Sequence, residues 1–425
     1  MSDHSIAEER EQPAPQTTPA QPIPQEPAEP QEDNLELPFE PMELKMGPSH
    51  PATHGTVRIL LKLDGETIVE AEVEVGYLHR GFEKECESGL YYQAFPYTDR
   101  LNYVSPMINN VGYALACEKL FGIDVPERCQ YLRVIASEIS RMSDHYTCLG
   151  ACSLELGAFT AFLYGVEARE QVWDVHDALC GARVTTNYVR IGGLSMDVGP
   201  EFPAFAREKL VQAGKLQQDM EDLLLSNPIF LQRMEKTGLL SKERLIGLGV
   251  TGPLLRAAGV PYDVRRAEPY LVYDRVDFDI PVGEAGDNLD RFLVRVEELK
   301  QSRRIVEQCL EQMREGPVDV NDPHVRLAGK GRVFNRMEEL IAQFKLVTEG
   351  PKPPVGEVYF AVEGGNGELG FYLVSDGTGK PLKCRARSPS FSNTQALSPM
   401  IQGALLADVI PTFDMINMIG GECDR

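Results

Sequence analysis

The chain has 425 residues, of which 43% are hydrophobic and 25% are charged, a balance typical of a globular protein with two or three domains or one large elaborated domain. A net charge of -22 at pH 7 disfavours nucleic acid and anionic lipid as direct partners. Nine cysteines without regular pairing, and no signal peptide before them, predict reduced thiols in a cytoplasmic protein.

The N-terminal segment, residues 1–34, is rich in Pro, Gln, Glu and Ala and has almost no bulky apolar side chains. It cannot offset the entropy lost on ordering, so we expect a disordered tail without a chemical role. From Leu35 the chain is expected to be structured. Residues 35–84 should form a β-hairpin and two polar loops. The strands of the hairpin are Val57–Leu63 and Thr67–Val75, and its turn is Asp64-Gly65.

The first polar loop is Gly47-Pro48-Ser49-His50-Pro51-Ala52-Thr53-His54-Gly55, with two imidazoles, two prolines and two glycines in nine residues. Its composition indicates a rigid loop that aims polar rings, because these residue types do not fill a core. The two histidines could titrate near neutral pH, donate a hydrogen bond or ligate a metal, or they could simply satisfy loop carbonyl groups. The second loop, Gly76–Lys84, is bounded by glycine and carries the exposed-looking pair His79-Arg80.

Residues 85–349 show helical periodicity and are expected to form a helical bundle. One helix, Glu127–Leu149, has its apolar positions at helical spacing with Arg133, Glu138 and Arg141 between them. The stretch Tyr146–Val166 is the best candidate for a membrane span, but its glycines and hydroxyl groups fit a helical hairpin buried inside protein better. The other predicted helices are Tyr91–Phe95, Ser105–Phe121, Thr160–Val184, Glu201–Ser226 and Ala285–Arg314.

Residues 350–425 have a mixed pattern and are expected to pack on the bundle. A stiff Gly-Pro connector precedes paired strands, and the end of the chain is apolar with a helix-turn pattern. The fold class is therefore predicted as α+β, a long central helical bundle with small antiparallel sheets made near both ends of the chain. The predicted strands and the apolar end are Gly356–Val362, Gly367–Ser375, Lys383–Arg387 and Met400–Gly420.

Several polar side chains could carry chemistry. Asp99-Arg100 and Tyr103 stand at a helix entrance, where they could face a ligand or form a cap and a surface ion pair. Glu155 lies beside the most apolar part of the chain, where a charge is either paired or functional, and with His54 it would form a proton-handling pair. Arg183 and Arg190 could approach a partner or an anionic cofactor, or they could be solvated surface residues.

Other motifs predict less. Cys148 and Cys152 are one helical turn apart but no second pair completes a metal site, so we interpret them as buried core thiols. The sequence has no Gly-x-Gly-x-x-Gly that joins a strand to a helix and no phosphate-binding Gly-x-x-x-x-Gly-Lys motif, so nothing indicates that this chain itself binds NAD or ATP. Gly-x-Ser-x-Gly and His-Glu-x-x-His are absent as well.

Taken together, five ordered motifs resemble one family. They are the Gly47–Gly55 loop, the Gly76–Lys84 loop, Tyr188-Val189-Arg190-Ile191-Gly192-Gly193, Gly367-Glu368-Leu369-Gly370 and the terminal Asp424-Arg425. The resemblance is to the D subunit of bacterial NADH:quinone oxidoreductase, respiratory complex I, from about Met42 to the end of the chain. It implies a fold related to the large subunit of nickel-iron hydrogenases.

The resemblance also implies the site. His54 and Tyr103 match the ligands of the quinone head group, and Glu155 stands where the family commonly has Asp as the partner of the histidine. The loops around the quinone would contribute His50, Thr53, Gly55, His79 and Arg80. The residues expected near the terminal iron-sulfur cluster are Arg100, Arg183, Thr185 and Arg190. Thr185 replaces a histidine found in many relatives, and this replacement predicts a cluster reduction potential that is lower and less dependent on pH.

In this family the chain holds no cofactor or metal of its own. Quinone is the substrate, and the iron-sulfur cluster belongs to the adjacent B-type subunit. The resemblance implies the C-type subunit and the membrane-arm subunits as further partners, and a peripheral position on the cytoplasmic side of the cell inner membrane. Quinone reduction would be coupled to proton translocation.

Two alternatives remain open at this point. A nickel-iron hydrogenase would need four cysteine thiolates, whereas the matching regions, Arg100-Leu101-Asn102-Tyr103 and Gly421-Glu422-Cys423-Asp424, contain only one thiol. A purely structural scaffold would leave the chemistry to the partner subunits. It predicts that substitution of His54 or Tyr103 leaves quinone reduction intact.

Overall fold

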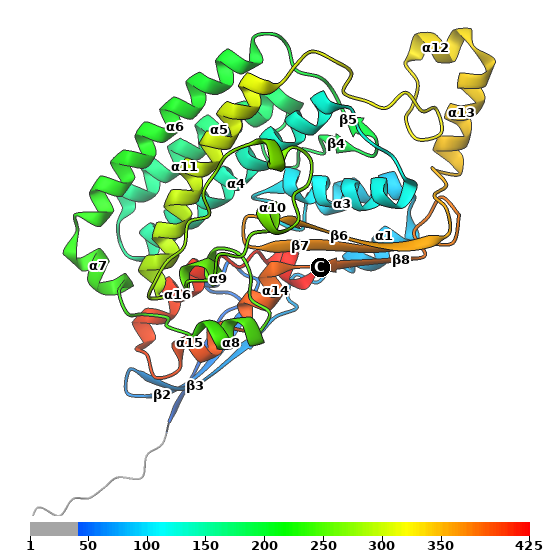
Figure 1. Cartoon of the computed structure of the whole chain (residues 1–425). Helices are drawn as coiled ribbons and strands as arrows, with labels where there is room; N and C mark the ends of the chain where they lie inside the picture. The colour runs from blue at the N-terminus through cyan, green and yellow to red at the C-terminus, as the bar shows by residue number, and fades with distance from the viewer. Residues whose placement is uncertain (1–40) are drawn as a thin grey trace, which may run out of the picture. The chain divides into compact units, whose positions relative to one another are not determined.

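Long helices form a bundle, with the strands and shorter helices beside it (Figure 1). The computed structural model describes residues 41–425; the tail predicted for residues 1–34 and the onset of structure predicted at Leu35 lie outside the described residues. The five longest helices are α3 (Pro106–Phe121), α4 (Glu127–Glu155), α5 (Phe159–Cys180), α6 (Phe202–Leu225) and α11 (Asn288–Gln312). They confirm the predicted bundle, and the boundaries predicted at residues 84 and 349 stay a prediction.

Helix α4 is central because it contacts α3, α5, α11 and the short helix α16 (Val409–Ile416). Most of its residues are therefore buried, including the charged side chains that the sequence pattern placed between its apolar positions. Arg133 pairs with Glu118 of α3 at 2.6 Å, and Glu138 accepts hydrogen bonds from Arg141, Arg265, Tyr273 and Ser302. These buried charges are paired, as expected for ionised groups in a core.

Helices α4 and α5 form the predicted helical hairpin; α4 is buried over most of its length, whereas α5 buries only one face. The predicted end of the first helix at Leu149 is wrong, since α4 continues to Glu155. Gly150 lies inside α4, where α5 packs closely against it. A Cβ built on Gly165 of α5 would lie 3.4 Å from the Cα of Gly150. In the described part of the chain, no helix combines the length and apolar character that crossing a membrane requires.

Two three-stranded antiparallel sheets flank the bundle. The first has the order β1-β2-β3 and the second the order β6-β7-β8, and α3 contacts β6 and β7. Strand β1 was not predicted, and its pairing with β2 places the first polar loop between two paired strands. The strands are β1 (Met42–Met46), β2 (Arg58–Asp64), β3 (Thr67–Glu74), β6 (Gly356–Glu363), β7 (Glu368–Ser375), β8 (Lys383–Arg387) and the two-residue strands β4 (Val189–Arg190) and β5 (Gly193–Leu194).

The first sheet shares a hydrophobic core with the end of the chain. Ile59 and Leu61 of β2 belong to the same buried cluster as Leu397, Ile401 and Phe413. This packing brings the N-terminal loops against the C-terminal helices, as Figure 1 shows for the blue strands and red helices. The remaining α-helices are α1 (Phe82–Ser88), α2 (Phe95–Thr98), α7 (Pro228–Met234), α8 (Lys242–Gly247), α9 (Pro253–Ala257), α10 (Val264–Ala267), α12 (Lys330–Asn335), α13 (Met337–Thr348), α14 (Pro389–Thr394), α15 (Leu397–Ile401) and α17 (Gly420–Asp424).

Candidate functional site

His54 and Tyr103 line one small cavity of about 90 Å³. It lies where the first polar loop, the loop before α3, the C-terminal part of α4 and the end of α16 meet. Most of the remaining walls are apolar. They are formed by Val104, Thr147, Cys148, Ala151, Phe413, Asp414, Asn417, Met418 and Ile419.

The histidine is held by the local structure of its loop. Residues Pro51–Thr53 form a 3-10 turn, His50 caps it by accepting a hydrogen bond from the Ala52 amide at 3.2 Å, and the Thr53 hydroxyl donates to the His50 carbonyl at 3.1 Å. His54 follows with φ 54°, in the left-handed region. His50 therefore shapes the loop, while the His54 ring faces Phe413, with ring centroids 6.4 Å apart.

The electrostatic surroundings of His54 favour its neutral form. Although the residue as a whole is exposed, protein atoms desolvate the ring and lower its pKa, and the negative charge of Glu155 only partly opposes this. A neutral imidazole can still donate one N–H to a ligand oxygen.

Tyr103 lies in the loop between α2 and α3 and is 41% exposed. The loop is fixed by Asn102, whose side chain accepts from the Val104 amide and donates to the buried carboxylate of Asp144 at 2.9 Å. Burial and the Asp144 charge raise the pKa of the Tyr103 phenol, so it keeps its proton near neutral pH. The phenol is thus an O–H donor on a loop that the buried Asp144 holds in place.

Glu155 is exposed at the end of α4 and does not line the cavity. Within residues 41–425 no hydrogen bond or ion pair joins it to His54, so its effect on the imidazole acts through space. The direct pair expected from the sequence is not formed in this structure.

Sequence analysis missed a second carboxyl group, Asp414, that does line the cavity. It is 5% exposed, and burial together with the charge of Glu155 raises its pKa well above the ordinary value. A signal was present, because Asp414 is a charged residue inside the apolar segment Met400–Gly420. Applying the argument used for Glu155 to this segment would have found it.

The second polar loop is attached to the end of the chain. The carboxylate of Asp424 accepts from the amides of Gly76 at 2.9 Å and Leu78 at 2.7 Å, and His79 Nδ1 lies 2.7 Å from the Asp424 carbonyl oxygen. Arg80 donates to the Arg100 carbonyl at 2.7 Å, which connects this loop to the segment that carries Tyr103. His79 and Arg80 therefore lie outside the cavity and brace its neighbourhood.

The arginines predicted near a cluster lie in a different region. Asp99 accepts a hydrogen bond from the Asn187 amide at 2.9 Å, and Arg190 donates to the Asn187 side chain at 2.6 Å, so the segments with Arg100 and Arg190 are held together. Burial raises the pKa of Asp99 to about 7. Arg183 is exposed and pairs with Glu170 at 3.2 Å.

Thr185 is also exposed, on the segment that joins α5 to β4. Further along this segment, Asn187 and Arg190 line a cavity of about 540 Å³. Asn187 and Arg190 therefore lie at a hollow separate from the His54 cavity, and Glu155, His79 and Arg80 line neither of the two.

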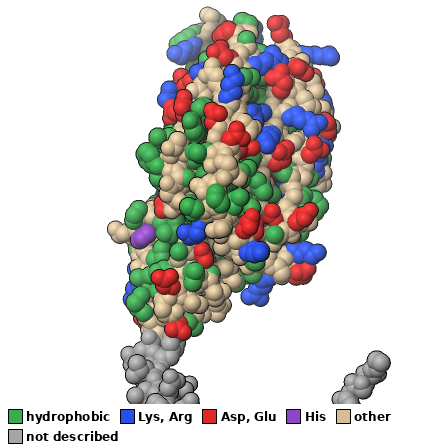
Figure 2. Space-filling view, turned by 90° about the vertical axis from the view of Figure 1, so that its left-hand side faces the viewer, with side chains coloured by type: hydrophobic (Ala, Val, Ile, Leu, Met, Phe, Trp, Pro, Cys, Tyr) green, Lys and Arg blue, Asp and Glu red, His purple; other side chains and the backbone are tan. Residues whose placement is uncertain are grey.

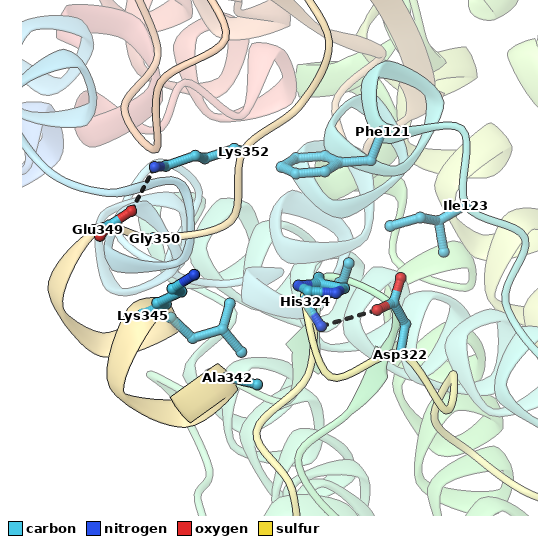
Figure 3. Close-up of a pocket in the computed structure, with 11 residues that line it drawn as sticks. Phe121, Ile123, Asp322, His324, Ala342, Lys345, Glu349, Gly350 and Lys352 are labelled. Carbon is cyan, nitrogen blue, oxygen red and sulfur yellow. Dashed lines mark hydrogen bonds and ion pairs between the residues drawn. The ribbon is translucent and has the colours of Figure 1, made fainter. Parts of the chain in front are cut away.

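Other pockets are larger, but their side chains are less suited to bind a ligand or take part in catalysis. The one in Figure 3 has a volume of about 380 Å³ and is formed by the end of α3, a loop that contains Asp322 and His324, and α13. Among its charged groups, Lys352 pairs with Glu349, and Asp322 accepts from the His324 amide at 2.8 Å. It offers no convergent set of polar groups.

The His54 cavity is itself too small for a complete ligand site. Ligand pockets usually have volumes of ~300–1,000 Å³, several times that of this cavity. The described chain can therefore supply only one wall of a site for a molecule larger than a few waters.

Comparison with known proteins agrees with the motifs. The family model described as respiratory-chain NADH dehydrogenase, 49 Kd subunit, matches residues 155–425. A D subunit of NADH-quinone oxidoreductase from Sorangium cellulosum (strain So ce56) is 56% identical over 395 residues, 93% of this chain and 98% of the relative.

Two further relatives carry the same description. The D subunit from Anaeromyxobacter dehalogenans (strain 2CP-C) is 52% identical over 389 residues, 92% of this chain and 90% of the relative. The D subunit from Myxococcus xanthus (strain DK1622) is 52% identical over 384 residues, 90% of this chain and 92% of the relative. The chain therefore belongs to the family of the 49 kDa or D-type subunits of respiratory complex I, a family related to the large subunit of nickel-iron hydrogenases.

Proposed function

We propose that this chain forms one wall of the quinone-reduction site of its NADH-quinone oxidoreductase. The observation that carries the proposal is the convergence of an imidazole and a phenol, His54 and Tyr103, on one mostly apolar cavity. A quinone head group has two carbonyl oxygens on an apolar ring and matches such a lining. The neighbouring B-type subunit would supply the opposite wall, because the cavity in this chain alone is too small.

The chemistry requires two electrons and two protons for each quinone. Tyr103 donates its O–H and neutral His54 its N–H to the carbonyl oxygens, which orients the ring and stabilises the negative charge that develops on reduction. The electrons arrive from NADH through the iron-sulfur cluster of the B-type subunit. That cluster would lie near Arg100, Arg183, Thr185 and Arg190, beside the larger hollow that Arg190 lines.

Exposed apolar surfaces support a position within an assembly. Helix α13 directs an apolar row outward, in which Met337 is 73% and Phe344 67% exposed. Figure 2 shows a further face on which hydrophobic side chains gather at the centre among mixed charges. Because single soluble chains rarely expose large apolar patches, we assign these surfaces to contacts with the B-type, C-type and membrane-arm subunits.

In this proposal the chain sits peripherally on the cytoplasmic side of the cell inner membrane, held there by its partners. The loops Pro48–Gly55 and Gly76–Lys84 would transmit quinone reduction to proton translocation in the membrane arm. The hydrogen bond from Arg80 to Arg100 and the contacts of Asp424 provide a physical path between the second loop and the cavity.

The test is quinone reduction by the assembled complex with His54→Ala or Tyr103→Phe. Each substitution removes one donor to the developing charge, so we expect kcat to fall by about 10²–10³-fold. Tyr97→Phe is a matched control, since Tyr97 is 40% exposed, close to the 41% of Tyr103, but does not line the cavity. Normal turnover of both variants in an assembled complex would support the scaffold alternative instead.

A further inference from the structure

Asp414 is an unusual carboxyl group because, within residues 41–425, its two side-chain oxygens have no hydrogen-bond partner. It lies in α16, its residue is 5% exposed, and it lines the His54 cavity. Both carboxylate oxygens are buried, and among residues 41–425 neither has a hydrogen-bond partner.

Other buried carboxylates of the core behave differently. Asp144 accepts hydrogen bonds from Asn102, Ser105 and Asn417. Glu298 accepts from Arg256 at 2.8 Å. A buried carboxylate without such donors is strongly disfavoured as an anion, and Asp414 therefore keeps its proton.

The charged and titratable groups around Asp414 act in the same direction. Glu155 at the end of α4 disfavours a second negative charge. On the same helix, burial raises the pKa of Cys148 to about 12, so this thiol stays neutral, and its sulfur donates to the Asp414 carbonyl oxygen at 3.4 Å. Cys152, also on α4, has its pKa raised by burial and is neutral too.

No cation compensates for a charge on Asp414 in the part of the chain that the structure describes. Helix α11 packs against α16 and carries Arg291 and Arg295. Arg291 donates to Asn288 and to the carbonyl oxygens of Gly238 and Gly286, and Arg295 donates to His145 and Asn366. Within the described residues no ion pair reaches Asp414. Besides the Cys148 thiol, the titratable groups that line the cavity with Asp414 are His54 and Tyr103, and both are neutral near pH 7.

We propose that Asp414 is a third polar catalytic group of the quinone cavity, which donates a hydrogen bond to a quinone oxygen and transfers its proton to that oxygen on reduction. This inference rests on the proposed function. The quinone takes two electrons that originate from NADH, and its two C=O groups become C–O–H groups. One proton comes from the Asp414 carboxyl and the other from the Tyr103 phenol, hydroquinone leaves, and both residues regain their protons from solvent.

The assignment predicts a specific pH dependence. Asp414 must be protonated to act, so kcat of the complex should fall as the pH rises through its pKa. Removing the negative charge of Glu155 makes ionisation of Asp414 easier and lowers that pKa, so this fall should begin at a lower pH. A residue with only a packing role would not produce either effect.

The experiment measures kcat and KM for quinone against pH in the assembled complex with Asp414→Asn and with Glu155→Gln. Asp414→Asn keeps the shape of the side chain and an N–H donor but carries no transferable proton, so we expect an unchanged KM, a kcat about 10²-fold lower and no alkaline fall in the pH range in which the Tyr103 phenol keeps its proton. Glu155→Gln removes the negative charge that raises the pKa of Asp414, so it should shift the alkaline fall to lower pH. Asp408→Asn is the control, because Asp408 precedes the same helix and pairs with Arg233 at 3.5 Å outside the cavity.

The outcomes separate this inference from the proposed function. Loss of turnover in His54→Ala and Tyr103→Phe, combined with wild-type kcat and pH profile in Asp414→Asn, overturns the role of Asp414 alone. Normal turnover in all three variants overturns the quinone site as well. If Asp414→Asn fails to assemble, the exposed Glu155→Gln variant decides, and an alkaline limb that stays in place refutes the proposal.

Discussion

The attachment of the second polar loop to the chain end can be tested by changing Asp424. Its two carboxylate oxygens each accept one backbone N–H, from Gly76 at 2.9 Å and from Leu78 at 2.7 Å. A hydrogen bond to a charged acceptor contributes about 1.5–3 kcal/mol. Asp424→Asn keeps one acceptor oxygen and places an NH2 group against the other amide, so one such contribution is lost, and Asp424→Ala loses both.

The assay is hydrogen exchange of the Gly76–Lys84 amides in the assembled complex. A loss of about 1.5–3 kcal/mol in local opening free energy corresponds to exchange about 10–100-fold faster for Asp424→Asn, with a larger increase for Asp424→Ala. Asp376→Asn is a matched control, because Asp376 also accepts a backbone N–H, from Thr378, but in an exposed turn far along the chain. Unchanged exchange at Gly76 and Leu78 in both Asp424 variants would refute the attachment.

Three other predictions concern buried charges and the predicted cluster region. Glu118→Gln leaves the fully buried Arg133 without its bidentate partner, so we expect the free energy of unfolding to fall by about 3–5 kcal/mol, measured by denaturant titration of the chain. Burial lowers the pKa of His176 from 6.5 to about 4, so on acidification the unfolded chain binds this proton before the folded chain does. The contribution of neutral His176 to the free energy of unfolding is therefore fully present above pH 6.5, and about 3 kcal/mol is lost as the pH falls through 4. His176→Gln should abolish this loss when unfolding is measured as a function of pH. Thr185→His should make the potential of the neighbouring cluster higher and more pH-dependent in a redox titration of the complex, and a steep slope already present with Thr185 would contradict the expectation.

Local patterns predicted the elements well. The strand prediction Lys383–Arg387 matches β8, and the predicted helix at Ser105–Phe121 matches α3 to within a residue. Errors came where packing overrides local preference. Strand β1 is short and its side chains are mostly exposed, so its apolar pattern is weak and only pairing with β2 defines it.

The sequence alone determined the long helices, most of the strands, the family and two of the residues that line the cavity, because periodicity and ordered motifs are local properties of the chain. The tertiary structure decided which of those residues meet. It placed Glu155 outside the cavity and brought Asp414 into it, since the position of a side chain along the sequence does not specify which face of a packed helix borders a hollow. It also showed that Arg133 and Glu138 are buried and paired, because α4 packs against its sequence neighbours α3 and α5 and against the distant helices α11 and α16.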